Sequence, residues 1–181
     1  MTSTLTDFGL STGTWTIDPA HSEVGFVVRH LMTKVRGSFD IFSGEITVGD
    51  SVETSSVSVT IEVDSVNTRQ PERDAHIRSA DFFAEDKKTI TFVSTGVRQD
   101  GDDYLVTGDL TVNGVTRSID LATEFVGVEG DAYGSTKAGF DASTTISRKD
   151  FGVDFNVPLD GGKLLVGDKV EITLSVQAAK V

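Results

Sequence analysis

Apolar and polar residues alternate along long stretches of this chain, and this period of two limits the fold more than any other feature. Val57, Val59, Ile61 and Val63 are apolar, and polar residues separate them. The same alternation runs over residues 170–176 near the C-terminus. Successive side chains of a β-strand point to opposite faces of the sheet. Each run therefore predicts a strand with one face in the core and one face in solvent.

Other segments with the same alternation predict further strands. They span residues 15–18, 24–30, 35–48, 89–97, 104–112, 115–125 and 138–146. Many short strands joined by tight turns are typical of an antiparallel sandwich or barrel.

The segment 35–48 changes its apolar parity midway. Val35, Phe39 and Ile41 share one face, whereas the apolar residues from Phe42 onward fall on the other face. One extra residue in a strand causes such a switch, so we expect a β-bulge near Phe42–Gly44.

Turn signals separate the strands, and one stretch indicates a helix. Asn113-Gly114 stands between two valines and is the strongest hairpin signal, because both residues tolerate positive φ. Asp100–Asp103 predicts a second turn. Residues 71–80 predict a helix in which Asp74 and Arg78 are spaced for an i,i+4 pair. We therefore expect an all-β antiparallel barrel of about eight strands with one or two short helices.

The length of 181 residues fits a single domain. We expect residues 1–13 to be a flexible N-terminal extension and residues 14–181 to form the barrel. The first residues lack the basic start and the apolar core of a signal peptide, so we expect a cytoplasmic protein. No segment approaches the roughly 20 apolar residues of a membrane span, and we expect no stable membrane insertion.

Composition excludes several kinds of chemistry and several partners. The chain has no cysteine, which removes disulfides, thiolate catalysis and thiolate zinc sites. Its net charge of -12 argues against a nucleic acid and disfavours an anionic membrane surface as electrostatic partners.

The three histidines, His21, His30 and His76, lack the close spacing of a metal motif. His30 shares its parity with the apolar residues of 24–30, so its side chain should point to the dry face. It is either a hydrogen-bonded core histidine or a polar contact for the head group of a ligand. A zinc site built by all three histidines is a weaker alternative, and we expect no metal.

Phenylalanine accounts for 11 of the aromatic residues, against one Trp and two Tyr. Phe26, Phe39, Phe92 and Phe140 fall on the dry parity of separate strands, and Phe82-Phe83 follows the expected helix. A filled core is the usual fate of phenylalanine. A barrel of about eight strands can also hold one small ligand, and periodicity does not distinguish the two.

Several motifs, in a fixed order, carry a resemblance to a known family. They include Trp15-x-x-Asp18-x-x-His21-Ser22, Val35-x-Gly37-x-Phe39, Asn67-Thr68-Arg69, Arg73-Asp74-x-His76-x-Arg78-Ser79-x-Asp81-Phe82-Phe83 and Arg148-x-Asp150-Phe151-Gly152. Each motif is weak alone, but their number and order are specific. From about Trp15 to the C-terminus, the chain resembles the YceI-like family of lipocalin-like polyisoprenoid-binding proteins.

This resemblance implies a lipocalin-like barrel whose elongated apolar lumen takes a long isoprenoid chain, such as a quinone or a prenyl phosphate. It implies no catalytic residue, so we expect a non-enzymatic protein that binds, stores or transports the lipid. We expect no cofactor besides that lipid. The residues expected to contact the lipid are Phe26, Val28, His30, Val35, Phe39, Phe42, Phe82, Phe83, Phe92, Val106, Leu121 and Phe140.

Two alternatives remain open at this point. One is an enzyme that acts on a lumen-bound lipid with His30 or His21 as acid–base group or metal ligand. The other is a stress-related interaction module, which would need a protein partner. A homodimer is compatible with each of them.

Overall fold

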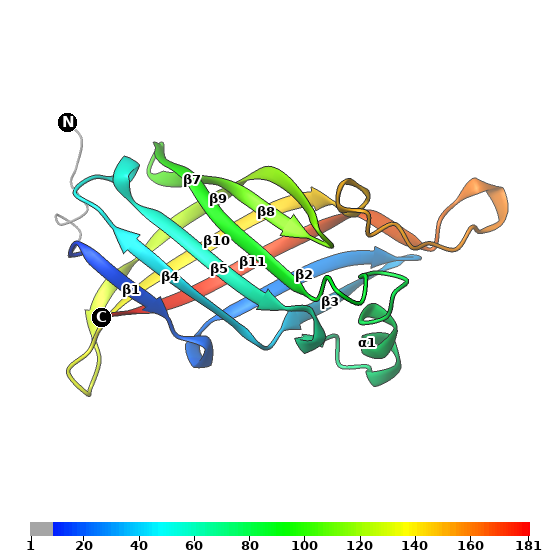
Figure 1. Ribbon diagram of the computed structural model, residues 1–181, viewed down its shortest axis with the longest axis horizontal. Coiled ribbons are helices and arrows are strands. Elements are labelled where there is room, and N and C mark those ends of the chain that lie inside the picture. The colour runs from blue at the N-terminus through cyan, green and yellow to red at the C-terminus, as the bar shows by residue number, and fades with distance from the viewer. Residues whose placement is uncertain (1–8) are drawn as a thin grey trace.

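Antiparallel strands form one barrel, shown from the side in Figure 1. The computed structural model describes residues 9–181, and this part of the chain contains an 11-stranded sheet. The strands are β1 (Gly13–Ile17), β2 (Glu23–His30), β3 (Thr33–Phe39), β4 (Phe42–Val48), β5 (Ser56–Glu62), β6 (Val66–Asn67), β7 (Thr89–Asp100), β8 (Asp103–Val112), β9 (Val115–Gly130), β10 (Thr136–Ser147) and β11 (Val166–Lys180).

The sheet closes because β1 pairs with both β4 and β11. From β1 the hydrogen-bonded order runs through β4, β5, β7, β8, β9 and β10 to β11, which returns to β1. Toward the other end, β2 pairs with β11, β3 pairs with β2, and β6 pairs with β3. These three strands continue β1, β4 and β5 along the chain, so the barrel has about eight strand positions. The expected all-β antiparallel barrel is confirmed.

The predicted bulge in segment 35–48 is wrong, because this segment forms two strands. The chain leaves the sheet after Phe39 and begins β4 at Phe42. Between them, the Asp40 amide donates to the Ser65 carbonyl oxygen at 3.0 Å, and Ile41 is exposed. The break explains the change of parity, since it turns the apolar side chains of both strands toward the inside.

Both predicted hairpin turns are present. Val112 pairs with Val115 across Asn113 and Gly114, whose φ angles are 53° and 76°. Asp100 pairs with Asp103 across the second turn.

Residues 9–181 contain one α-helix, α1, which spans Pro71–Ile77. The Gln70 side chain accepts a hydrogen bond from the Arg73 amide and caps its first turn. The expected pair of Asp74 with Arg78 is wrong. Asp74 is buried and its carboxylate accepts from the Thr68 amide at 2.8 Å and from the Thr68 hydroxyl at 2.5 Å. This contact fixes α1 to the strand end that precedes it.

Short 3-10 helices connect several strands. They span Pro19–His21, Val52–Thr54, Val63–Ser65, Arg148–Phe151 and Asp160–Gly162. No helix in residues 9–181 has the length and apolar character needed to cross a bilayer.

Residues 1–8 of the expected extension 1–13 lie outside the described residues. Within residues 9–13, Leu10 is buried with Trp15 in a cluster at the end of the barrel where the C-terminus lies (Figure 1). The Trp15 indole Nε1 donates to the Ser11 carbonyl oxygen at 3.0 Å, and Gly13 already belongs to β1.

Candidate ligand cavity

The inside of the barrel holds a cavity of about 570 Å³, within the roughly 300–1,000 Å³ that is usual for small-molecule sites. Every strand of the closed ring contributes side chains to its wall, as does β2. Alternation places them there, because one residue in two on each strand faces inward. The wall is almost entirely apolar, and no carboxylate of residues 9–181 belongs to it.

The two ends of the cavity differ. At the end with the C-terminus, a cluster of buried residues is formed by Leu10, Trp15, Val48, Val52 and Ala178. These side chains fill the barrel there, and Trp15 is fully buried.

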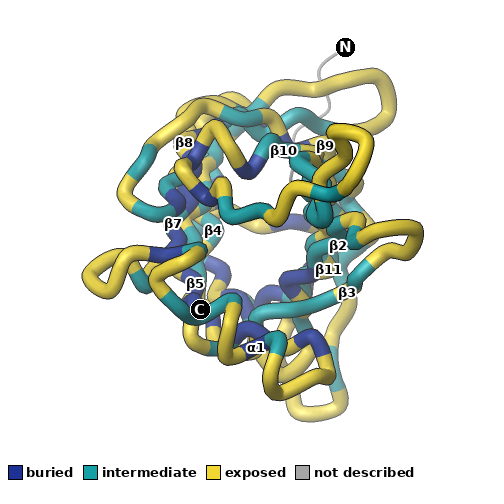
Figure 2. Tube along the Cα trace, turned by 90° about the vertical axis from the view of Figure 1, so that its right-hand side faces the viewer, coloured by how far each residue is buried: buried dark blue, intermediate teal, exposed yellow. Residues whose placement is uncertain are grey.

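The opposite end is open to solvent. Figure 2 views the barrel from this end, with α1 at the lower rim. His76 and Val157 line the cavity, yet both are exposed. The cavity therefore reaches the surface between α1 and the connection of residues 152–165 that joins β10 to β11.

Two glycines leave room for phenylalanine rings on the inner wall. Phe26 pairs with Gly37, and a Cβ at position 37 would collide with the Phe26 ring. A Cβ at Gly108 would collide with the ring of Phe92 in the same way. Because the rings lie against bare backbone, they cover the wall instead of crossing the lumen.

The charged and imidazole side chains of the wall lie at the open end, whereas Ser55, Ser56, Tyr104 and Thr123 line it nearer the other end. His30 pairs with Val166, whose carbonyl oxygen accepts from Arg148 Nη2 at 3.4 Å. Across the opening, the His76 ring of α1 lies edge-on against Phe155, with 4.7 Å between centroids. Phe155 in turn provides a carbonyl oxygen to Arg148 Nη1 at 3.0 Å. His30, His76 and Arg148 thus surround the same opening.

Most of these polar groups are already engaged with the protein. Arg73 donates from Nε to the Thr68 hydroxyl and from Nη2 to the Thr68 carbonyl, both at 2.8 Å. His76 Nε2 lies 2.8 Å from Asp81 Oδ2. His30 differs, because its imidazole has no hydrogen-bond partner within residues 9–181. It is the wall group with spare hydrogen-bonding capacity at the opening.

Arg148 holds the connection 152–165 in place. Its side chain is 6% exposed and donates to three further carbonyl oxygens, those of Gly167, Val153 and Phe155, at 2.9–3.0 Å. Burial lowers the pKa of the Arg148 guanidinium, while the charges of Asp168 and Asp154 oppose this shift.

Asp168 secures the same region from the β11 side. Its carboxylate accepts from the Ser147 hydroxyl at 2.5 Å and from the Lys149 amide at 3.2 Å. Burial raises the pKa of the Asp168 carboxyl, but these hydrogen bonds outweigh it and hold the pKa below its usual value. The end of β10 and the start of β11 are therefore tied together beside the opening.

Comparison with known proteins identifies the family to which this barrel belongs. The family model of the YceI-like domain matches residues 15–178. The chain belongs to the YceI-like family.

Relatives of this YceI-like chain agree with that membership. Protein YceI of Escherichia coli is 39% identical over 163 residues, which cover 88% of this chain and 82% of that protein. The crystal structure of Burkholderia cenocepacia BcnA superposes with a TM-score of 0.77 at 25% identity, covering 89% of this chain and 98% of BcnA. A polyisoprenoid binding domain of Saccharophagus degradans shares the fold, with a TM-score of 0.64 at 18% identity, and the match covers 94% of this chain and all of that domain.

Every residue expected to contact a lipid lies on the cavity wall of this YceI-like barrel. These residues are Phe26, Val28, His30, Val35, Phe39, Phe42, Phe82, Phe83, Phe92, Val106, Leu121 and Phe140. Their contact with a ligand stays a prediction, whereas their place on the wall is observed.

The histidines do not come together. His21 lies in the 3-10 helix Pro19–His21 with its Nδ1 2.7 Å from Asp18 Oδ2, and it does not line the cavity. Within residues 9–181 the three histidines therefore form no zinc site, and His21 cannot act on a ligand in the lumen. The alternative of an enzyme that uses His30 stays untested. The His21 hydrogen bond lowers the pKa of the Asp18 carboxyl.

Sequence reasoning missed wall residues outside the alternating runs. Arg148, Val153, Phe155 and Val157 line the open end from a segment with no periodicity. The motif that begins at Arg148 was the only signal there, and it did not indicate which way the side chains point.

Proposed function

We propose that this protein binds a long-chain isoprenoid lipid, with the chain in the barrel and the polar head at the open end. One observation carries the proposal: the cavity wall is almost entirely apolar, a cluster of buried residues fills one end, and the charged and imidazole side chains lie at the other end. A linear lipid with an apolar chain and one polar head matches this arrangement of apolar and polar groups.

The free energy for this binding comes from burial of the chain. Each buried CH₂ contributes about 0.8 kcal/mol, so a prenyl chain needs no charged contact to bind tightly. Ordering of the chain and incomplete burial consume part of this gain, since non-covalent affinities end near about 20 kcal/mol. Selectivity then depends on lumen length and on the head-group contact.

His30 is the residue that we expect to contact the head group. Its imidazole can donate from one nitrogen and accept at the other, which suits the oxygen atoms of a quinone or of a prenyl phosphate. The lack of carboxylates on the wall favours a head that is neutral or negative. The fold shared with the polyisoprenoid binding domain of Saccharophagus degradans supports the ligand class.

Mass spectrometry of lipids extracted from the purified protein tests the proposal. An isoprenoid should be recovered, and lipid-free protein should take up a prenyl quinone in titration. Absence of both would overturn it.

Two histidine variants test the head-group contact. His30→Ala should weaken binding of a prenyl quinone by several-fold, the value of one hydrogen bond, and should leave binding of a plain hydrocarbon unchanged. His21→Ala is the matched control, because His21 lies outside the cavity. Equal losses for both ligands in His30→Ala would remove His30 from the head site.

We further propose storage or transport of the lipid, without turnover, as the cellular role. A cytoplasmic location, a part in a stress response and a homodimer stay predictions. Fractionation of the native host and gel filtration of the full chain test the location and the dimer.

A further inference from the structure

The hairpin of β2 and β3 carries an unusual turn beside the opening. Its turn residues are Leu31 and Met32, and they are 51% and 89% exposed. Leu31 has a φ of 53°, in the left-handed region that bulky residues rarely adopt. Hairpins place glycine, asparagine or aspartate at such positions, as this chain does at Asn113-Gly114. An exposed apolar pair therefore stands where local stability favours small or polar residues.

A second exposed apolar pair lies next to this turn. The Leu31 amide donates to the Leu165 carbonyl oxygen at 2.9 Å, and the Leu165 amide donates to the Val157 carbonyl oxygen at 3.0 Å. Val157 and Leu164 of that connection are 40% and 48% exposed. Leu31, Met32, Val157 and Leu164 together form what we call the apolar collar. It borders the cavity, because Val157 and Leu165 line the wall.

Positive charge surrounds the turn. Arg29, Lys34 and Arg36 are exposed on the outer face of the hairpin, whose only acidic residue is Glu23. Arg29 and Lys34 lie directly opposite one another, an arrangement of like charges that destabilises a strand pair. None of these three cations forms an ion pair within residues 9–181. They are available to an anionic partner.

We propose that the apolar collar and the three hairpin cations dock this end of the barrel on a bilayer that contains anionic lipids. Leu31 and Met32 would enter the interfacial region, while the cations contact lipid phosphates. Docking of this kind is peripheral and reversible. It presents the open end of the cavity to the layer in which an isoprenoid resides.

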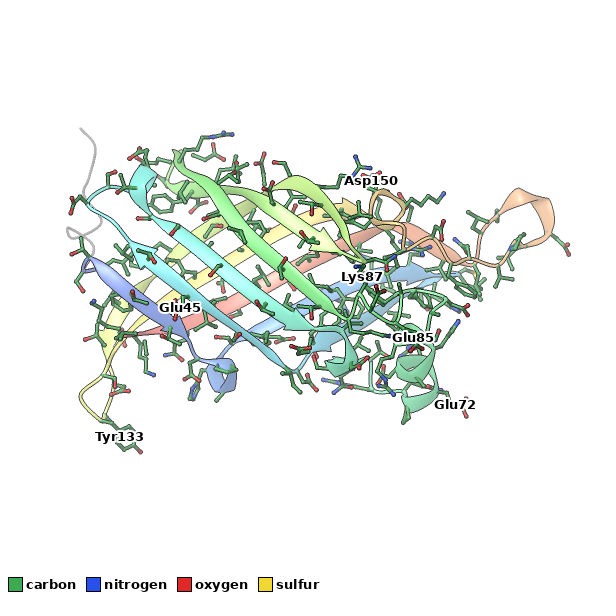
Figure 3. All side chains as sticks on the ribbon, viewed as in Figure 1. Glu45, Glu72, Glu85, Lys87, Tyr133 and Asp150 are labelled. Atoms are coloured by element: carbon green, nitrogen blue, oxygen red, sulfur yellow. The ribbon has the colours of Figure 1, made fainter. Side chains whose placement is uncertain are left out.

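The net charge of -12 includes acidic residues at this end of the barrel, such as Glu72 and Glu85 (Figure 3), but the β2–β3 hairpin itself carries three cations and one carboxylate. β7 has 12 residues, which at about 3.3 Å per residue extend roughly 40 Å. The Debye length at physiological salt is about 8 Å, so charges at the far end are screened from a bilayer at the collar. The interaction then depends on the charges at this end, and Arg29 and Lys34 are the ones that flank the exposed turn.

Vesicle sedimentation with the full chain tests the proposal. The protein should bind vesicles of phosphatidylcholine with phosphatidylglycerol, should not bind phosphatidylcholine alone, and should dissociate as salt is raised. Arg29→Gln, Lys34→Gln and Arg36→Gln together should reduce binding about a hundredfold, at roughly fivefold for each cation. The control changes Arg98, Lys137 and Lys180 to Gln, alters the net charge equally, and should change binding little.

The variant Leu31→Gly with Met32→Ser separates the apolar contribution from the charge. It gives the turn the residue types that its geometry favours, so the fold should be retained. Vesicle binding should nevertheless fall at least tenfold, since two apolar side chains no longer enter the bilayer.

A site-specific label gives an independent readout, because the chain has no cysteine. Met32→Cys with an environment-sensitive fluorophore should shift to the blue on anionic vesicles. The same label at Tyr133→Cys should not shift. Tyr133 is 93% exposed and lies at the other end of the barrel from Glu72 of α1 (Figure 3).

Several results would overturn the proposal. They are absence of vesicle binding at low salt, equal losses in the two triple variants, and a blue shift at position 133 instead of 32. A dimer that dissociates in the Leu31→Gly, Met32→Ser variant, without vesicle binding, would assign the collar to a second copy of the chain. Failure here leaves the lipid-binding proposal intact, since extraction of an isoprenoid does not depend on docking.

Discussion

Replacing Arg148 with methionine tests whether one buried side chain holds the open end in shape. Methionine keeps an unbranched apolar stem but removes the guanidinium. Three carbonyl oxygens, those of Gly167, Val153 and Phe155, then lose their donor. The Val166 carbonyl oxygen keeps a partner, because Asn156 Nδ2 also donates to it at 2.7 Å.

The magnitude follows from these unpaired acceptors. Each buried carbonyl left without a donor costs about 1–3 kcal/mol. Asp154 is exposed and Asn156 partly so, and water can replace part of the lost hydrogen bonding. We therefore expect a loss near the lower bound, about 3 kcal/mol, concentrated in residues 152–165.

Hydrogen exchange by NMR measures this local loss. The amides of Leu159 and Leu165 are hydrogen-bonded within the connection. A local opening made easier by about 3 kcal/mol should raise their exchange about a hundredfold, with the strand amides of β8 and β9 little changed. A bound prenyl quinone should also dissociate faster, because this segment lines the opening.

Arg117→Met is the matched control. Arg117 also donates from Nε to a backbone oxygen, that of Asp150 at 3.2 Å, but it is exposed. We expect its effect to stay within about 0.5 kcal/mol. If both variants raise exchange equally, burial of Arg148 is not what stabilises the connection and the reasoning fails.

Three further predictions concern the wall and the pH response. Gly37→Ala should push the Phe26 ring into the lumen, lower the free energy of unfolding by about 1–3 kcal/mol and reduce uptake of long chains more than of short ones. In the control Gly96→Ala the new Cβ would meet open space, so melting and lipid uptake should stay unchanged. Phe39→Asp should abolish lipid uptake or folding, because an unpaired charge on the wall costs several kcal/mol, and unchanged melting and uptake would show that Phe39 is not inside. Burial raises the Asp168 pKa, but the hydrogen bonds to its carboxylate lower it by more, so the folded-state pKa lies below the usual value. The free energy of unfolding should therefore fall as pH drops from about 4 through the folded-state pKa. A denaturation series over this pH range should show a shallower fall for Asp168→Asn.

The sequence predicted the wall well because a strand has only two faces. Once 24–30 or 89–97 is read as a strand, one apolar residue such as Phe26 or Phe92 fixes which of its neighbours face the lumen. Closure of the barrel then brings these faces together without further information. This is why the predicted contact residues on the strands line one cavity; Phe82 and Phe83 lie on no strand, and α1 and the turn after it place them on the same wall.

Irregular segments were predicted less well, for a physical reason. The break at Asp40–Ile41 depends on a hydrogen bond to Ser65, which is distant in sequence. Asp74 was matched to its helical neighbour Arg78 but bonds to Thr68 instead, because a buried carboxylate is better satisfied by an amide and a hydroxyl. The connection 152–165 has no periodicity at all, and its shape depends on the carbonyl groups around Arg148.

The net charge of the whole chain does not show how charge is distributed on its surface. The net charge of -12 predicted that an anionic membrane would be disfavoured as a partner, yet the β2–β3 hairpin carries three unpaired cations at one end of the barrel. Sequence alone did not reveal that these cations flank an exposed apolar turn beside the opening.

The apolar collar is built from two segments, and only one of them, the connection 152–165, also borders the opening. Ligand release and the proposed membrane docking can therefore be perturbed separately. Val157 and Leu164 of the collar belong to the connection held by Arg148, whereas Leu31 and Met32 belong to a hairpin that keeps its own strand pairing. Loosening the connection should change how fast a ligand leaves while the hairpin still partitions to the bilayer. Removing the apolar turn should change partitioning while the rate of ligand release in solution stays the same. A variant of either kind that altered both quantities would show that the hairpin and the connection move as one unit.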